Sequence, residues 1–286
     1  MSLKNPQITK TQTETALNLK RLHSLPLACF RFTLFVLWML VVLSSQSILL
    51  FFKLDAAKRW PMVLHRVFCW ILGIKIEVRG KICRDKPTFY VSNHASYIDI
   101  LVIGSLLEGA FIAKKEIESW PIFGYVTKLQ RSIFVERKRT QANTQKNEIL
   151  ERLQQGGSLF LFPEGTSSDG NRVLPFKSSL FSFAQTLPNL PIQPISISYA
   201  TLNGIPVGRM WRPFFAWYGD MNLMPHMWQM MGMGTLKVIV EFHPPMKAEI
   251  QGASRKEIST LCEKVITFAH NDALHTCFDI QKKKKS

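Results

Sequence analysis

The 286-residue sequence lacks the short motifs of several large protein classes. It has no CxxC pair, no HExxH helix and no GxSxG turn, which argues against a zinc site, a metalloprotease and an α/β-hydrolase nucleophile. Its five cysteines are scattered along the chain, as is typical of free thiols in a reducing compartment. We therefore expect no metal site and no catalytic cysteine.

Acidic residues are also scarce. Twenty Asp and Glu stand against 36 Lys and Arg, which gives a formal net charge of +16 and indicates a polyanionic partner. The sequence contains neither an RNP-like aromatic motif nor a basic helix with heptads, so a nucleic-acid partner is not expected. Because 47% of the residues are hydrophobic, the charge and the composition together favour an anionic membrane surface.

One long stretch lacks charge altogether. Residues 32–52 carry no charged side chain, and as a helix they would reach roughly 30 Å, enough to cross the core of a bilayer. We expect a polar tail over residues 1–26 and a membrane-anchoring helical segment over 27–74. A single transmembrane span is one alternative. Basic residues on both sides of the stretch and polar residues 44–47 favour instead a re-entrant or interfacial hairpin whose second arm is 60–74. Two ordinary buried helices are the remaining alternative.

Strand-like and helix-like patterns alternate after residue 74. This alternation predicts an α/β fold with a largely parallel central sheet flanked by helices. The expected strands are 74–80, 88–92, 110–113, 132–136, 158–162, 192–198 and 236–242. The expected helices are 97–107, 140–155, 178–187 and 254–275. We place one domain at 75–278 and a basic tail, containing four consecutive lysines, at 279–286.

Chemically distinctive residues follow four of these strands. His94, Lys114, Arg137 and Glu164 each stand just after an expected strand. Ligands of open parallel sheets bind at the carboxyl ends of the strands, so these side chains are predicted to meet at one edge. Glu164 is the most unusual of them, because a carboxylate at the end of a buried strand is costly unless it is paired or hydrogen-bonded.

The stretch "NHASYID" places His94 and Asp99 five residues apart. On a continuous helix they would point about 140° apart, so they meet only if His94 precedes the helix and Asp99 lies in its first turn. Ser96 as the N-cap would allow this arrangement. Asp99 would then orient His94 as a general base, or it merely completes a capping box; spacing alone leaves both open. Without a protein nucleophile, such a base suits direct activation of a substrate hydroxyl.

At this point the motifs are similar to those of a known family. "NHASYID", "IFVER", "FPEGT" and "PISI" resemble, in this order, the four motifs of the PlsC-like lysophospholipid acyltransferases, over roughly residues 74–245. The extended stretch 162–181 also resembles the branch that completes ornithine lipids. Gln130-Arg131 and Ser179 stand where many relatives have glycine, which leaves the acceptor headgroup open.

The resemblance implies an acyltransferase domain over 75–278. His94 would take the proton of a lysolipid hydroxyl, Asp99 would orient His94, and the hydroxyl oxygen would attack the thioester of acyl-carrier protein or acyl-coenzyme A. No cofactor is expected beyond that acyl donor. Arg137 would be the phosphate-binding arginine. The full set of predicted substrate-binding residues is Arg137, Glu164, Gly165, Thr166, Lys114 and Lys177. For Glu164 the alternative is a structural ion pair with an Arg or Lys.

The leading hypothesis is a membrane-bound O-acyltransferase that converts 1-acyl-sn-glycerol 3-phosphate into phosphatidic acid in phospholipid biosynthesis. A lyso-ornithine lipid O-acyltransferase is the alternative acceptor class. A non-catalytic membrane adaptor with the same fold, or a hydrolase in which His94 activates water, would be another kind of protein. We expect the protein at the cell membrane with its active site at the cytoplasmic face.

Overall fold

The computed structural model describes residues 22–85, 87–120, 123–135, 142–182, 186–187, 189–246 and 252–283. Within these ranges eight strands form one sheet. They are β1 (Ile74–Gly80), β2 (Phe89–Ser92), β3 (Ala110–Lys114), β4 (Ile133–Val135), β5 (Leu159–Leu161), β6 (Ile192–Leu202), β7 (Ile205–Pro206) and β8 (Leu236–Phe242). The order is β1-β8-β6-β2-β5-β3-β4, and β7 pairs with β6.

The sheet is parallel through its centre. Strands β6, β2, β5, β3 and β4 run in one direction, whereas β8 is antiparallel to β6 and carries β1 parallel to itself. Every residue of β2 and β5 is buried, which explains why these strands appear in the sequence as short continuous apolar runs. The predicted α/β class is confirmed, and the carboxyl ends of β2, β3 and β5 lie at the same edge.

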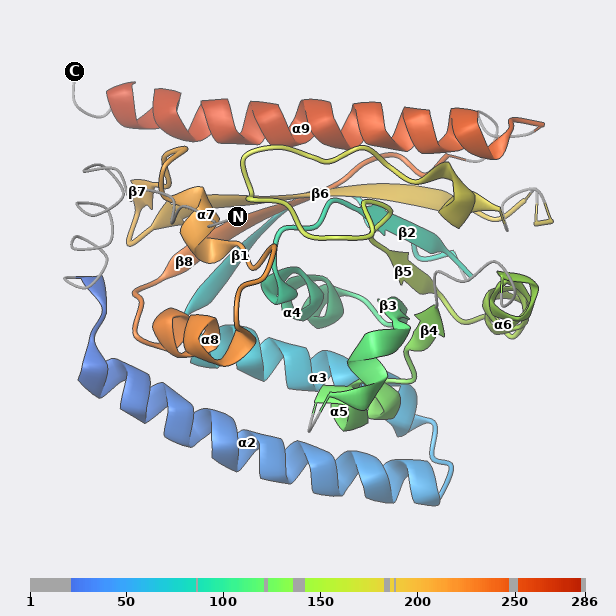
Figure 1. Cartoon of the computed structure of the whole chain (residues 1–286), viewed down its shortest axis with the longest axis horizontal. Coiled ribbons are helices and arrows are strands. Elements are labelled where there is room, and N and C mark those ends of the chain that lie inside the picture. Colours follow the sequence, from blue (N-terminus) through green and yellow to red (C-terminus); the bar gives the residue numbers. More distant parts are fainter. Residues whose placement is uncertain are drawn as a thin grey trace, which may run out of the picture.

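Helices cover both faces of the sheet (Figure 1). The helices are α2 (Leu25–Phe51), α3 (Ala56–Ile71), α4 (Tyr97–Leu106), α5 (Phe123–Leu129), α6 (Ala142–Gln154), α7 (Arg212–Phe215), α8 (Leu223–Met231) and α9 (Arg255–Lys283), with short 3₁₀ turns η1 (Lys115–Ser119) and η3 (Ser178–Phe181). Helix α9 lies along one face over β6, and α4, α3 and α2 lie on the other.

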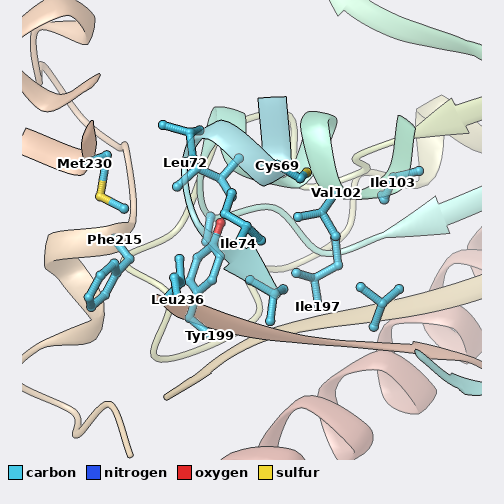
Figure 2. Close-up of a cluster of buried hydrophobic side chains, with 14 of the residues drawn as sticks. Cys69, Leu72, Ile74, Val102, Ile103, Ile197, Tyr199, Phe215, Met230 and Leu236 are labelled. Atoms are coloured by element: carbon cyan, nitrogen blue, oxygen red, sulfur yellow. The ribbon is translucent and has the colours of Figure 1, made fainter. Parts of the chain in front are cut away.

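Each face has its own hydrophobic core. Figure 2 shows part of the first, to which Val102 of α4, Ile197 of β6 and Met230 of α8 all belong. The second core joins β2 and β5 to α9 through Phe89, Leu159 and Cys262. Because the strands are packed on both faces, the loops that follow their carboxyl ends start from rigid positions.

The N-terminal helices α2 and α3 form a hairpin connected by residues 52–55 and pack against each other. Helix α2 is long and apolar enough to cross a membrane, by length and composition. About half of its apolar side chains are exposed, whereas α3 is amphipathic and buries Leu64, Phe68 and Ile71. The expected second arm, 60–74, is therefore found as α3, which begins four residues earlier and ends before β1.

Two expectations for the catalytic half are corrected by the structure. The helix expected at 178–187 is the short 3₁₀ turn η3, and residues 183–185 lie outside the described ranges. Phe181 is buried in the second core and Ser182 donates its N–H to Ser179, which fixes a tight turn there. Strand β6 continues past Ser198 to Leu202 because it keeps pairing with β8 through an irregularity between Tyr199 and Thr201.

Candidate active site

The carboxyl ends of β2 and β5 bring two predicted residues into direct contact. These strands are adjacent and parallel, and the chain continues from them to His94 and Glu164 respectively. The backbone N–H of His94 donates a hydrogen bond to Oε1 of Glu164 at 2.6 Å. Residues seventy positions apart in the chain therefore meet at the sheet edge where parallel α/β folds bind their ligands.

His94 and Asp99 also meet, in the geometry that their spacing required. Helix α4 begins at Tyr97 with Ser96 as N-cap, so His94 lies in the preceding loop and Asp99 in the first turn. His94 Nδ1 lies 2.9 Å from Asp99 Oδ2. The same oxygen accepts the backbone N–H groups of Ala95 and Ser96, at 2.7 and 2.9 Å. The sequence alone left open whether Asp99 caps α4 or orients the ring of His94. In the structure this one buried carboxylate makes both sets of contacts.

The second oxygen of Asp99 has a partner that the sequence did not reveal. Tyr199 of β6 donates its hydroxyl to Asp99 Oδ1 at 2.6 Å, and its ring belongs to the core shown in Figure 2. Burial, with the neighbouring charge of Asp99 as a second cause, raises the pKa of Tyr199 well above its ordinary value, so the phenol keeps its proton. Asp99 is thus held by donors from the loop before α4 and from β6.

The imidazole of His94 is fixed on one side and open on another. The ring of Phe162 stacks on it with centroids 4.1 Å apart and an interplanar angle of 19°. The His94 side chain is 17% exposed. Within the described part of the chain, Nε2 has no hydrogen-bond partner, in contrast to Nδ1. With Nδ1 bound to a carboxylate, Nε2 is the nitrogen that can accept a proton from a substrate.

Glu164 holds two loops together through backbone donors. Its Oε1 accepts from His94 and its Oε2 accepts the N–H of Leu174 at 2.9 Å. The residue is only 2% exposed. Burial raises the pKa of Glu164 to about 8, although both hydrogen bonds favour the charged form. The structure shows no Lys or Arg ion pair for it among the described residues, and its contact with an acceptor stays a prediction.

The rest of the "FPEGT" turn is shaped around Gly165 and Lys177. Gly165 has φ +66°, a conformation that favours glycine. A Cβ atom at this position would lie 2.6 Å from Nζ of Lys177, so the lysine side chain lies directly over the glycine. Lys177 is also tied to the turn by its N–H, which donates to the carbonyl of Pro163 at 2.9 Å. Thr166 is exposed beside them.

Of the two remaining predicted cations, Lys114 lies among the described residues and Arg137 does not. Lys114 is the exposed last residue of β3 and pairs in register with Val135 of β4. Arg137 follows β4 and lies outside the described residues, so its role stays a prediction. Among the described residues, no three His, Cys, Asp or Glu side chains form a group that could hold a metal ion.

Sequence reasoning missed the residues that hold the His94 loop from β6. The side-chain amide of Asn93 donates to the carbonyl of Ile197 at 3.0 Å and accepts the N–H of the same residue at 2.8 Å. The carbonyl of His94 accepts the N–H of Ser168 at 2.8 Å. Asn93 stands within "NHASYID", which was a usable signal. Tyr199 had none, because its contact depends on the packing of β6 under α4.

These features are the ones expected of a hydroxyl-activating enzyme: a histidine with one open ring nitrogen, in contact with a buried carboxylate, at the open edge of an α/β sheet. Comparison with known proteins agrees. A family model described as "Acyltransferase" matches residues 74–198. The chain is 41% identical over 249 residues to a lyso-ornithine lipid O-acyltransferase of Rhizobium meliloti (strain 1021), covering 84% of this chain and 85% of the relative.

A second relative is the 1-acyl-sn-glycerol-3-phosphate acyltransferase of Neisseria meningitidis serogroup B (strain ATCC BAA-335 / MC58). It is 30% identical over 191 residues, covering 66% of this chain and 72% of the relative. The crystal structure of the lysophosphatidic acid acyltransferase PlsC from Thermotoga maritima has the same fold, with a TM-score of 0.63 and 23% identity, covering 87% of this chain and 95% of that one. The chain belongs to the acyltransferase family.

Proposed function

We propose that this enzyme is a lyso-ornithine lipid O-acyltransferase, which transfers a fatty acyl group from a thioester to the free hydroxyl of lyso-ornithine lipid. The sequence motifs had placed lysophosphatidic acid first among the acceptors. The relative that acts on lyso-ornithine lipid is 41% identical over 249 residues, whereas the lysophosphatidic acid enzyme is 30% identical over 191. This difference supports the ornithine-containing acceptor.

The observation that carries the proposed chemistry is the His94–Asp99 pair with Nε2 open. Nε2 takes the proton of the acceptor hydroxyl while its oxygen attacks the carbonyl carbon of the thioester. An oxygen–carbon bond forms, the carbon–sulfur bond breaks, and the proton passes from Nε2 to the departing thiolate. The imidazolium present between these two transfers is stabilised by Asp99 at 2.9 Å from Nδ1.

The proposed donor is acyl-carrier protein or acyl-coenzyme A, because each presents the acyl group as a thioester. Both are anionic, and the net charge of +16 would favour their approach. Such donors are cytoplasmic, so the proposed active site opens to the cytoplasmic face of the cell membrane. No further cofactor takes part in the proposed reaction.

The proposed membrane attachment is the outer surface of α2. Its exposed apolar side chains form one continuous helical surface: Leu25, Phe30, Phe32, Val36, Leu37, Leu40, Val41, Ile48 and Phe51. Monomeric soluble proteins rarely expose an apolar patch of this length. Because α3 returns beside α2 and packs on α4, the hairpin would enter one leaflet instead of delivering the chain to the far side.

The test is an acceptor competition with purified full-length protein in detergent. Equal amounts of lyso-ornithine lipid and lysophosphatidic acid are offered with one acyl-carrier donor, and the lipid products are identified by mass spectrometry. We expect ornithine lipid as the main product, and none with the His94→Ala variant. Phosphatidic acid as the main product would overturn the proposed acceptor and restore the lysophosphatidic acid hypothesis, while release of free fatty acid would indicate a hydrolase.

A further inference from the structure

A polar cavity lies on the opposite edge of the sheet from His94. It has a volume of about 510 Å³, in the range of ligand pockets. Its lining includes Ala110, the first residue of β3, and Ser158, which directly precedes β5. His94 and Glu164 follow the carboxyl ends of β2 and β5, so this cavity is distinct from the proposed active site. Nothing in the acyl-transfer mechanism uses it.

Basic side chains outnumber acidic ones in the walls of this cavity. Arg131, Arg152 and Lys58 line it, against the single acid Glu108. Arg152 donates a hydrogen bond to the carbonyl of Arg131 at 3.1 Å, which keeps the two arginines together. Burial, and then the charge of Arg131, lower the pKa of Arg152. Among the described residues, neither arginine forms an ion pair with an acid.

Arg131 occupies this position against its backbone preference. It has φ +58°, in the left-handed region, just after the end of α5. The N–H of Arg131 donates to Lys128 at 2.8 Å and that of Ser132 to Thr127 at 3.2 Å, the pattern of a helix end at which glycine is favoured. A non-glycine residue held there is strained, and such strain is concentrated at functional sites. The guanidinium is the feature that glycine could not supply.

The cavity lies next to the turn of the N-terminal hairpin. Its lining includes Lys58 and Pro61 from the first turns of α3. Two large apolar side chains are exposed where α2 ends and the connection begins, Phe51 at 79% and Phe52 at 64%. If the hairpin lies in one leaflet, as in the proposed membrane attachment on which this step rests, the cavity is at the level of the lipid headgroups.

We propose that this cavity binds the phosphate of an anionic bilayer lipid, with Arg131 and Arg152 as its charged hydrogen-bond donors. Arginine suits the role because its planar fork donates to two phosphate oxygens at once. The bound lipid is not a substrate. The bound lipid contacts the start of α3, which forms one wall of the cavity, and thereby holds the hairpin turn against the sheet.

The test is calorimetric titration of the full-length protein in nonionic detergent at about 150 mM salt, where weak long-range attraction is screened. Three probes are used without acyl donor: dihexanoyl phosphatidylglycerol, dihexanoyl phosphatidylcholine and inorganic phosphate. The variant is Arg131→Gly, which removes the cation and relieves the strained backbone, so it should unfold at the same temperature as the original or higher. Lys53→Gly is the matched control, because exposed Lys53 also has a positive φ, +52°, and lies in the same hairpin but does not line the cavity.

We expect phosphatidylglycerol to bind more tightly than phosphatidylcholine or inorganic phosphate. Arg131→Gly should weaken this binding about tenfold or more, the loss typical of charge-assisted hydrogen bonds, and Lys53→Gly by less than about twofold. Equal losses in the two variants, or none in Arg131→Gly, would overturn the site. Inorganic phosphate binding as tightly as phosphatidylglycerol would overturn the lipid as its source. Because no acyl transfer is measured, these outcomes are independent of the acceptor competition.

Discussion

The buried carboxyl of Glu164 should make the stability of this protein depend on pH in an unusual direction. Burial raises its pKa from 4.5 to about 8. Between these two values the folded protein holds a proton that the unfolded chain releases, so stability is fully present below about pH 4.5 and falls as pH rises toward 8. At about 1.36 kcal/mol per pH unit, this interval corresponds to roughly 5 kcal/mol at most.

The substitution Glu164→Gln removes the titration and one acceptor. The glutamine oxygen can still accept one of the two backbone N–H groups, from His94 or Leu174, but its amide nitrogen faces the other as a second donor. An unsatisfied buried donor costs about 1–3 kcal/mol. At pH 5 the variant should therefore be less stable than the original protein. By pH 8.5 the difference should vanish or reverse, because only the original protein loses stability over this range.

The assay is the unfolding temperature of both proteins in detergent from pH 5 to 8.5, followed by tryptophan fluorescence. At about 2–4 °C per kcal/mol, the difference between the two unfolding temperatures should change by roughly 10 °C between pH 5 and 8.5. All other titrating groups are shared, so their effects largely cancel in the difference between the curves. Two curves that stay parallel over the whole range would refute the reasoning, since they would show that Glu164 takes up no proton in the folded state.

Three further predictions concern the base, its orientation and the anchor. His94→Ala should lower acyl transfer by about 10²- to 10⁴-fold with an unchanged circular dichroism spectrum, and Asp99→Asn should also be strongly impaired, because an amide does not stabilise the imidazolium; a folded, active His94→Ala enzyme would disprove the mechanism. Tyr199→Phe, which removes the hydroxyl bound to Asp99 Oδ1, should lower kcat about tenfold or more at an unchanged acceptor KM, whereas an unaltered kcat would show that this bond is dispensable. Replacement of the exposed α2 residues Leu37, Leu40 and Val41 by serine should release the protein from membranes in high salt. Sedimentation with membranes as before would contradict the proposed anchor.

The last variant is preferable to deletion of residues 1–74, for a reason that the sequence did not show. Ala28 of α2, and Cys69 and Leu72 at the end of α3, belong to the first hydrophobic core. A deletion would expose that core, so loss of membrane binding and loss of folding would coincide. The uncharged run predicted an apolar helix, but periodicity did not show which part of it packs on the protein, because almost every side chain in it is apolar.

The sheet was largely predictable because its central strands are short. Buried parallel strands appear as apolar runs bounded by turn residues, so β2, β3 and β5 were predicted within one residue at each end. Strands β1 and β8, which lie outside this parallel centre, were predicted to the residue. Helices α7 and α8 were not predicted. Helix α8 buries Met227, Met230 and Met231 in the first core. Methionine fills irregular gaps between elements, and this use has no sequence period.

The contact between His94 and Asp99 was predictable because its geometry is local. A capping serine, a histidine before it and an aspartate in the first turn determine one another within seven residues. The contacts of Tyr199 and Glu164 are long-range. Tyr199 reaches Asp99 across 100 residues because β6 lies beneath α4, and Glu164 reaches His94 across 70 because β2 and β5 are neighbours. Such contacts follow from strand order, which local patterns do not contain.

The hydrogen bonds around Asp99 and Glu164 bear on which part of the site can recognise the acceptor. All four carboxylate oxygens of Asp99 and Glu164 accept hydrogen bonds from the protein itself: His94, Ala95, Ser96, Leu174 and Tyr199 provide the donors. The catalytic frame therefore presents mainly Nε2 of His94 to the substrate, and Nε2 recognises a hydroxyl without regard to the headgroup. A lyso-ornithine lipid and a lysophosphatidic acid both offer that hydroxyl. We therefore expect discrimination between them to come from other side chains, and Thr166 and Lys177, predicted substrate-binding residues, are both exposed.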